Sequence, residues 1–256
     1  MVGGIAALAA EHRVHVVGGN LTRSPGPLMI DVTVAGTVKR RQVLTRVGAR
    51  PGDAVYVSGS VGEARAGLSL LKAGSGGSPE SDAGRLAAAY LRPEARVRLG
   101  VWLGRNRAAT ACIDLSDGLA DGVHRIAEAS GVGIAVDSDA LPISPAARAV
   151  FERDGGDPVS EALSGGDDYE LLFTVGRRMQ RSVVAAARHG GVPLTRIGEC
   201  TRDRGVRLAR GGAESPLALT AFSHFGAPSP AASASHGCMS SPAASASRAR
   251  AVFCAT

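Results

Sequence analysis

Two short segments of the chain combine carboxylates with glycine turns. The first, residues 111–121, reads Ala-Cys-Ile-Asp-Leu-Ser-Asp-Gly-Leu-Ala-Asp and carries Asp114, Ser116 and Asp117 where a short apolar strand runs into a helix. The second, residues 164–173, reads Ser-Gly-Gly-Asp-Asp-Tyr-Glu-Leu-Leu-Phe and opens onto another apolar strand. Carboxylates beside the free N–H groups of a helix start suit a metal ion that carries a phosphate. The two segments therefore predict phosphate chemistry.

The first segment has two interpretations. In the functional one, Asp114 and Asp117 offer hard oxygen ligands to Mg²⁺, and the helix N-terminus binds an anion near Ser116. In the structural one, Ser116 is the N-cap of the helix, and Asp117 merely complements the helix dipole. We favour the functional interpretation because a carboxylate that ends a buried strand, as expected for Asp114, is costly unless a cation or a hydrogen-bond donor meets it.

Two glycine pairs extend this pattern. Gly18 and Gly19 precede Asn20, and such a turn lets backbone N–H groups approach a phosphate, although a Gly-Gly pair more often forms a plain turn. Gly165 and Gly166 also form a pair, and three acidic residues follow it within four positions. Charge this dense beside glycines suits the recognition of a cationic ligand.

Composition bounds the class of protein. The chain has 256 residues, of which 45% are hydrophobic and 20% charged, as is ordinary for a folded cytosolic protein. Its net charge of +6 comes mostly from scattered arginines, and the few aromatic residues are dispersed, which argues against a nucleic-acid partner. The four cysteines form no C-x-x-C pair, so we expect neither a disulfide framework nor a zinc site. No apolar run reaches membrane-spanning length, and we expect a cytoplasmic protein without a membrane partner.

Periodicity and turn residues predict mixed α and β structure, which we class as an α+β (mixed α/β) fold. Strands are expected at 14–17, 28–37, 54–58, 111–114, 133–137, 169–175, 196–198 and 206–209. Helices are expected at 5–11, 62–73, 82–90, 94–106, from 117 onward, and at 145–153 and 177–189. On the helix after Asp117 we expect three polar residues to form a solvated face: Asp121, His124 and Glu128.

Four motifs, in their order and spacing, resemble the thiamine-monophosphate kinase family. They are Val-Val-Gly-Gly-Asn-Leu-Thr-Arg at 16–23, Leu-Thr-Arg-Val-Gly-Ala-Arg-Pro-Gly-Asp at 44–53, Ile-Asp-Leu-Ser-Asp-Gly-Leu at 113–119 and Gly-Gly-Asp-Asp-Tyr-Glu-Leu at 165–171. The resemblance covers roughly residues 4–225. This family belongs to a superfamily shared with aminoimidazole ribonucleotide synthetase.

The resemblance implies a domain organisation and an activity. Residues 41–225 would form the C-terminal α/β domain of the aminoimidazole ribonucleotide synthetase-like fold, and residues 1–40 a remnant of the N-terminal ATP-binding and dimerisation domain. Residues 226–256 would form a disordered tail, because 20 of these 31 residues are Ala, Ser or Pro. The implied activity is the phosphorylation of thiamine monophosphate to thiamine diphosphate by ATP and Mg²⁺, through direct in-line transfer.

The resemblance also implies roles for single residues. Asp114 and Asp117 would be the catalytic pair and would bind Mg²⁺, with Asn20 at a further ligand position. Contacts to ATP are implied for Gly19, Asn20, Arg46 and Ser116. Contacts to thiamine monophosphate are implied for Asp167 and Phe222, because a carboxylate and a ring face suit the cationic thiazolium.

The chain departs from the family pattern in three ways. A family chain carries a substantial N-terminal portion before the equivalent of Gly3, with further magnesium-binding aspartates. The family usually has Asp where this chain has Asn20, and Glu where it has Asp167. We therefore expect activity that is impaired by the missing ligands. The alternatives are a catalytically inactive fragment that binds nucleotide or thiamine phosphate, and another enzyme of the superfamily acting on aminoimidazole ribotide precursors or selenide.

The family forms homodimers through strands of its N-terminal domain. Residues 28–37 would be a remnant of those strands, and we expect this remnant to present an exposed edge. The resemblance therefore leaves the homodimer open for this chain.

Overall fold

The structure, a computed structural model, describes residues 2–218 and 252–254 and divides into two compact units. The larger unit begins at Arg41, and the smaller one consists of the residues up to Arg40 together with the short strand at 252–254. None of the helices in the described ranges is long and apolar enough to cross a bilayer.

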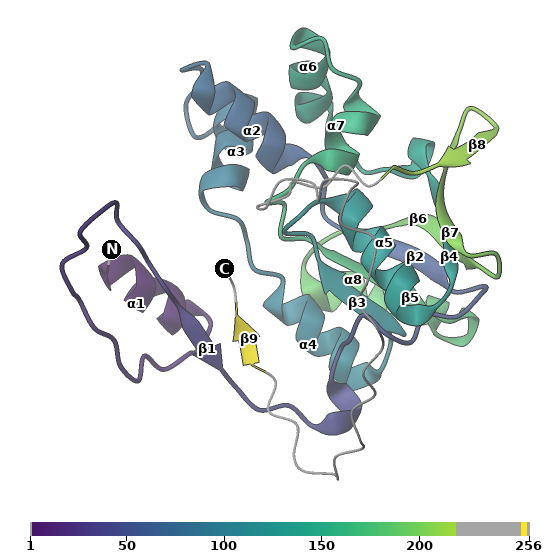
Figure 1. The fold of residues 1–256 in the computed structure, drawn as a ribbon, viewed down its shortest axis with the longest axis horizontal. Helices are drawn as coiled ribbons and strands as arrows, with labels where there is room; N and C mark the ends of the chain where they lie inside the picture. The colour runs from purple at the N-terminus through teal and green to yellow at the C-terminus, as the bar shows by residue number, and fades with distance from the viewer. Residues whose placement is uncertain (1, 219–251, 255–256) are drawn as a thin grey trace, which may run out of the picture. The chain divides into compact units, whose positions relative to one another are not determined.

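The larger unit is built on a seven-stranded sheet with the strand order β3-β5-β2-β6-β4-β7-β8 (Figure 1). Neighbouring strands pair antiparallel except for β4 and β7, which run parallel. The strands are β2 (Ala54–Ser58), β3 (Ala111–Asp114), β4 (Gly133–Asp137), β5 (Leu171–Val175), β6 (Leu194–Thr201), β7 (Gly205–Arg210) and β8 (Ala213–Pro216). This is the mixed α/β class that the sequence predicts.

Seven α-helices accompany the sheet, several of them with clear start signals in the sequence. They are α2 (Glu63–Lys72), α3 (Asp82–Leu91), α4 (Val97–Asn106), α5 (Leu119–Ser130), α6 (Pro145–Arg153), α7 (Pro158–Ser164) and α8 (Val183–Gly190). The side chains of Ser81, Ser144 and Asp157 accept a backbone N–H at the starts of α3, α6 and α7. Pro145 and Pro158 follow two of these caps, where a missing N–H costs nothing.

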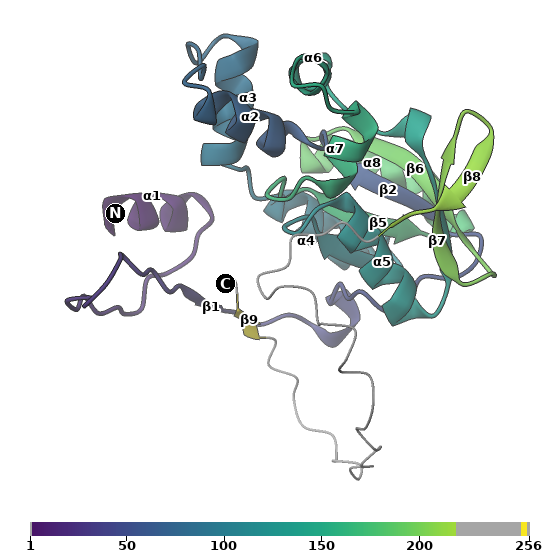
Figure 2. The ribbon, with the colours of Figure 1, turned by 45° about the horizontal axis from the view of Figure 1, so that its top comes forward.

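The core lies in two layers, one on each face of the sheet. Along β5, Leu172 belongs to one buried cluster and Phe173 to the other, as the alternation of a strand requires. The apolar stripe of α5 packs into the first cluster, whereas α4 and α8 pack into the second (Figures 1 and 2). Each fully buried large side chain contributes about 1.5–3 kcal/mol, so these layers hold β3, β5 and α5 in fixed relation.

The smaller unit has little buried structure of its own. It contains α1 (Val2–Glu11) and β1 (Thr33–Ala35), which pairs antiparallel with β9 (Val252–Cys254). The predicted half-buried strand at 28–37 is wrong, because only three residues are extended and all three are exposed. The predicted strand at 14–17 does not form either. Apolar side chains such as Val17 and Met29 are exposed, and no buried side chain lies among the described residues of this unit.

The resemblance implies a border between residues 1–40 and 41–225, and this domain assignment, with the first part as a domain remnant, stays a prediction. Residues 219–251 and 255–256 lie outside the described residues, so the disordered tail at 226–256 stays a prediction as well.

Candidate active site

The two acidic segments lie side by side because β3 and β5 are antiparallel neighbours. Asp114, the last residue of β3, stands opposite Leu171, the first residue of β5. Beyond this pair the ladder continues into the loops: Leu115 donates its N–H to the carbonyl of Glu170 at 2.9 Å and accepts from the N–H of Tyr169 at 3.0 Å. The end of one strand and the start of the other therefore form one continuous surface.

Glycines allow the two loops to approach this closely. The N–H of Asp167 donates to the carbonyl of Ser116 at 2.8 Å. A Cβ atom on Gly166 would lie only 2.7 Å from that same carbonyl oxygen, and one on Gly118 would lie 2.7 Å from the carbonyl oxygen of Gly165. Gly118 also has a φ of +102°, which other residues rarely adopt. The glycines of both motifs are thus required by packing between the loops.

Helix α5 begins beside this surface without a capping side chain. Its N-cap is Gly118, and no side chain of the described residues accepts a hydrogen bond from its first turn. The alternative interpretation, in which Ser116 is the N-cap, is therefore wrong. Uncapped N–H groups at the positive end of a twelve-residue helix attract an anion. Ser116 and Asp117 lie immediately ahead of that end.

Asp114 and Asp117 are both accessible. Asp114 is exposed and Asp117 is half-buried, and neither carboxylate forms a hydrogen bond or ion pair with another described side chain. Burial raises the pKa of the Tyr169 hydroxyl, and the negative charges of Asp167, Asp114 and Asp117 raise it further. The carboxylates of both loops thus act on one small region around Tyr169.

This donor set fits magnesium. Within the described residues no group of three or more His, Cys, Asp or Glu side chains forms a ready-made metal cage. Mg²⁺ usually keeps several waters and is held by one or two carboxylates together with substrate phosphates. Asp114 and Asp117 supply such a pair, and the open start of α5 lies next to them.

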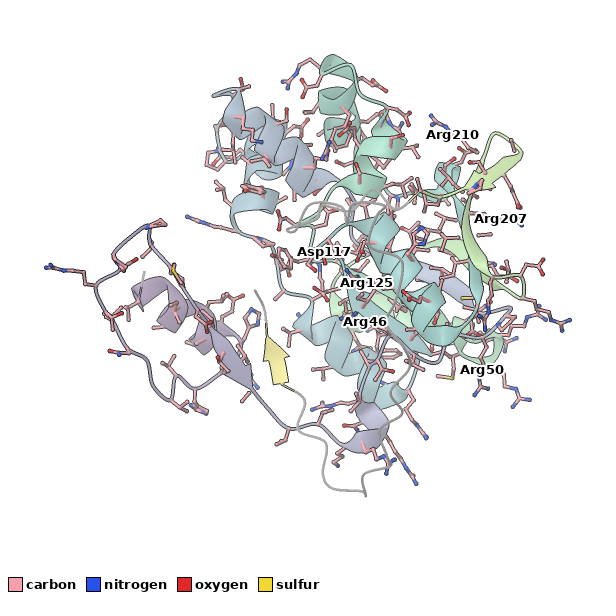
Figure 3. All side chains as sticks on the ribbon, viewed as in Figure 1. Arg46, Arg50, Asp117, Arg125, Arg207 and Arg210 are labelled. Carbon is pink, nitrogen blue, oxygen red and sulfur yellow. The ribbon has the colours of Figure 1, made fainter. Side chains whose placement is uncertain are left out.

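Two arginines, Arg46 and Arg125, lie against or on α5. Arg125 forms an ion pair with Asp121, and that hydrogen bond, followed by the charges of Asp121, Asp117 and Glu128, raises its pKa. Arg46 lies further along the helix, since its carbonyl accepts the hydroxyl of Ser130 at 3.0 Å (Figure 3). The backbone of Arg46 therefore lies at the C-terminal end of α5, and the contact of its side chain with ATP stays a prediction.

The expected solvated face of α5 is wrong for two of its three residues. Asp121 is buried and paired with Arg125. The Nε2 atom of His124 lies 2.9 Å from the carbonyl oxygen of Leu217, so this histidine ties the end of the described chain to α5. Glu128 is exposed as expected. Sequence periodicity places these residues on one face but gives no sign of the segment that packs there.

Of the three acidic residues that follow Gly166, only one is exposed. Asp167 points outward and has a φ of +65°. The Asp168 carboxylate instead accepts N–H groups at the start of α2, and burial raises the pKa of this carboxyl to about 7. Of the acids whose density suits a cationic ligand, Asp167 is therefore the one that is exposed to solvent.

Glu170 belongs to a buried polar cluster that sequence reasoning missed. Arg96 donates to its two carboxylate oxygens at 2.8 and 2.6 Å, and the hydroxyl of Ser58 donates to it as well. Glu170 is 6% exposed and Arg96 17%. The cluster joins the end of β2, the start of α4 and the start of β5. No local motif marks Arg96 or Ser58, because their partner lies more than seventy residues away.

The described structure does not test three of the predicted site residues. Gly19 and Asn20 are exposed residues of the smaller compact unit. Phe222 lies outside the described residues. Their roles in binding ATP, Mg²⁺ and thiamine monophosphate stay predictions.

Comparison with known proteins identifies the family. Residues 50–210 match the family described as AIR synthase related protein, C-terminal domain. The chain is 39% identical over 223 residues to the thiamine-monophosphate kinase of Salmonella typhimurium, an alignment that covers 87% of this chain and 67% of that protein. The chain spans about two thirds of the length of this and other curated relatives.

Solved structures of thiamine-monophosphate kinases are also similar to this chain. The thiamine-monophosphate kinase of Stenotrophomonas maltophilia is 39% identical with a TM-score of 0.62, over 69% of this chain and 56% of that one. AaThiL complexed with AMPPCP and TMP is 34% identical with a TM-score of 0.60, over 71% of this chain and 54% of that one. The chain belongs to the thiamine-monophosphate kinase family and carries its AIR synthase related C-terminal domain at residues 50–210.

Proposed function

We propose that this protein transfers the γ-phosphate of ATP to thiamine monophosphate, in a Mg²⁺-dependent reaction that yields thiamine diphosphate and ADP. One observation carries the proposal: the carboxylates of Asp114 and Asp117 lie beside the uncapped start of α5, without a hydrogen-bond partner among the described side chains. The pairing of β3 with β5 holds this junction in place. Family membership and the neighbouring structure with AMPPCP and TMP support the choice of substrates.

The proposed reaction is an in-line displacement. A phosphate oxygen of thiamine monophosphate attacks the γ-phosphorus of ATP, the new P–O bond forms, and the bond to the ADP oxygen breaks. Asp114 and Asp117 would hold Mg²⁺, which neutralises charge that accumulates on the phosphates. The first N–H groups of α5, together with the Ser116 hydroxyl, would orient the phosphate oxygens. Pre-set donors of this kind need no rearrangement when charge develops.

We place the proposed binding site for thiamine monophosphate at the loop before β5, which carries Asp167. Asp167 is exposed and carries the negative charge that a thiazolium ring would meet. Phe222 is proposed to cover the ring. Leu217 is fixed to His124 on α5, and the five residues from there to Phe222 span at most about 17 Å, enough to reach the start of the helix. Gly19, Asn20 and Arg46 complete the proposed ATP contacts.

The cellular setting is part of the same proposal. A kinase that uses ATP and a small phosphorylated vitamin works where both are available, so we propose a cytoplasmic location, with small molecules rather than nucleic acid or membrane as partners. Magnesium dependence follows from the two-carboxylate donor set.

Activity and binding are tested separately. Incubation of the protein with ATP, Mg²⁺ and thiamine monophosphate should produce thiamine diphosphate, and calorimetry should show Mg²⁺-dependent binding of AMPPCP. Asp117→Asn should weaken AMPPCP binding at least tenfold, because an amide is a weaker ligand for Mg²⁺ than a carboxylate. Asp203→Asn, an exposed aspartate outside this site, is the matched control and should leave binding unchanged. Equal binding by both variants would contradict the assigned metal site.

A second candidate, a nucleotide-binding protein without turnover, is favoured by one observation. Asn20 stands where the family usually has a carboxylate, and an amide is a weaker ligand for Mg²⁺. Binding of AMPPCP without formation of thiamine diphosphate would select this candidate. If the protein neither binds AMPPCP nor forms thiamine diphosphate, both candidate functions are ruled out.

A further inference from the structure

We infer that Asp168 is a positioning residue for the proposed substrate site: its carboxylate ties the loop that carries Asp167 to the first turn of α2. The inference rests on the proposed function, since that loop is the one proposed to meet thiamine monophosphate. None of the motif roles implied by the family resemblance involves Asp168.

The contacts of Asp168 are those of a helix cap supplied from a distant segment. One carboxylate oxygen accepts the N–H of Gly62 at 2.7 Å, and the other accepts the N–H of Ala64 at 3.2 Å. Gly62 is the N-cap residue of α2, has a φ of +82° and offers no side chain of its own. A carboxylate at this position is also favoured by the positive end of the helix dipole. The first turn of α2 and the acidic loop are therefore fixed to one another.

The backbone on both sides of Asp168 needs this attachment. Asp167 has a φ of +65° and Tyr169 a φ of +51°, in the left-handed region that non-glycine residues seldom occupy. Such conformations are strained and persist only where the surroundings impose them. With Asp168 held inward, the two neighbouring side chains are turned toward the surface shared with Asp114 and Asp117. Asp168 thus sets the direction of Asp167.

The electrostatic surroundings make the two N–H donors essential. Glu63 on α2 and Glu170 at the start of β5 both lie close enough for their charges to disfavour the charged form of Asp168. Arg96 is engaged by Glu170, and Arg65 on α2 by Glu161. An asparagine at position 168 would keep one acceptor but turn an NH₂ group toward a backbone N–H, and the loop would lose one of its two attachments.

The test compares Asp168→Asn with Ser144→Ala in the full chain. Ser144 accepts the N–H of Ala147 at 3.3 Å at the start of α6, so its loss also removes a helix cap but leaves the acidic loop attached. By calorimetry at pH 8, D168N should raise the Kd for thiamine monophosphate at least tenfold and change the Kd for AMPPCP less than threefold. S144A should change neither.

A second readout does not depend on any ligand. The N–H of Asp167 is bonded to the carbonyl of Ser116, so its hydrogen exchange reports whether the loop stays in place. D168N should accelerate this exchange at least tenfold, and S144A should not. An unchanged exchange rate, or an unchanged Kd for thiamine monophosphate when the wild type binds it, overturns the inference. If the wild type binds no thiamine monophosphate, the proposed function fails, and the exchange rate alone decides whether Asp168 holds the loop.

Discussion

At the scale of single residues, the acidic side chains near the site fall into two groups with opposite tasks. The carboxylates of Asp114, Asp117 and Asp167 are accessible to a ligand. Those of Asp168 and Glu170 instead accept hydrogen bonds from other parts of the protein. Carboxylates whose oxygens accept several protein donors hold structure. Asp114 and Asp117 accept no hydrogen bond from a described side chain, and Asp167 accepts only the hydroxyl of Tyr169, at 3.4 Å, so these three are available to a ligand. In the second loop the accessible Asp167 directly precedes the two engaged acids, so the same short segment both anchors itself and presents a charge.

Arg96→Ala should destabilise the protein strongly. It removes the partner of the buried Glu170 and leaves an uncompensated charge, which costs about 3–5 kcal/mol. Chemical denaturation measures the change in the free energy of unfolding. The matched control is Arg85→Ala, since Arg85 pairs with Asp82 on the exposed side of α3 and should cost less than about 1 kcal/mol. Similar losses for both variants would show that the Glu170 cluster contributes little.

The raised pKa of Asp168 predicts a pH dependence of stability. The pKa of this carboxyl is about 7 in the folded protein and lies near its ordinary value of about 4 in the unfolded chain. The folded state therefore binds the extra proton between these values, and stability falls as pH rises through this window. D168N cannot titrate there. Urea unfolding at pH 5 and pH 8 should show the wild type losing stability relative to D168N, and a constant difference would refute the raised pKa.

At the scale of elements, the site depends on the pairing of β3 with β5 and on the close approach of the loops that extend them. The ladder passes from Asp114 opposite Leu171 into the hydrogen bonds of Leu115. Neither loop holds its shape through its own contacts alone. A change that separates the loops should therefore impair binding even when it leaves every ligand-binding side chain intact.

Gly118→Ala should have this effect. The added methyl group would meet the carbonyl oxygen of Gly165 at 2.7 Å, and the backbone would be strained at a φ of +102°. We expect a loss of about 2–4 kcal/mol from strain and overpacking together, with weaker binding of AMPPCP. Gly155→Ala is the control, because Gly155 has a φ of +78° but no atom within 4 Å of the added Cβ. Thermal unfolding measures the loss of stability of each variant, and calorimetry measures its affinity for AMPPCP. Both substitutions strain the backbone, but only the one at Gly118 disturbs the contact between the loops, so the difference between the variants reports that contact.

At the scale of the whole molecule, the buried core lies in one compact unit, whereas two of the predicted ATP contacts lie in the other. Every buried apolar side chain of the described residues lies between Ala49 and Val206, in the larger compact unit. Residues 2–40 have none, although they carry exposed Val, Leu and Met side chains. The predicted ATP contacts Gly19 and Asn20 lie in this smaller unit.

Deletion of residues 2–40 should therefore change the free energy of unfolding by less than about 0.5 kcal/mol, as expected for residues that bury no core. The same deletion should weaken AMPPCP binding if Gly19 and Asn20 contact the nucleotide. It should also improve solubility, because it removes exposed apolar surface. Denaturation and calorimetry on the shortened chain measure the first two effects. Unchanged binding would contradict the roles of Gly19 and Asn20.

Several elements were determined by the sequence alone, because their signals are local. The strands 54–58, 111–114 and 133–137 and the helix 145–153 form with the predicted bounds, since β-branched runs, turn residues and a Ser-Pro start decide them. The segments α7 and β8 were missed: α7 is a single short stretch, and Ala-Glu-Ser-Pro has no strand pattern. The long predicted strand at 28–37 failed because an alternating pattern forms a strand only when a partner surface covers it.

The sequence also determined which residue types stand at the site, because the motifs that place Asp114, Ser116, Asp117 and Asp167 are contiguous. Only the tertiary structure decided how these motifs meet and what each carboxylate does. The antiparallel pairing of β3 with β5 joins segments about fifty residues apart, and hydrogen bonds from Gly62 and Arg96 withdraw two of the acids from the ligand. A carboxylate's role depends on the donors around it, and those donors come from segments that no local pattern connects.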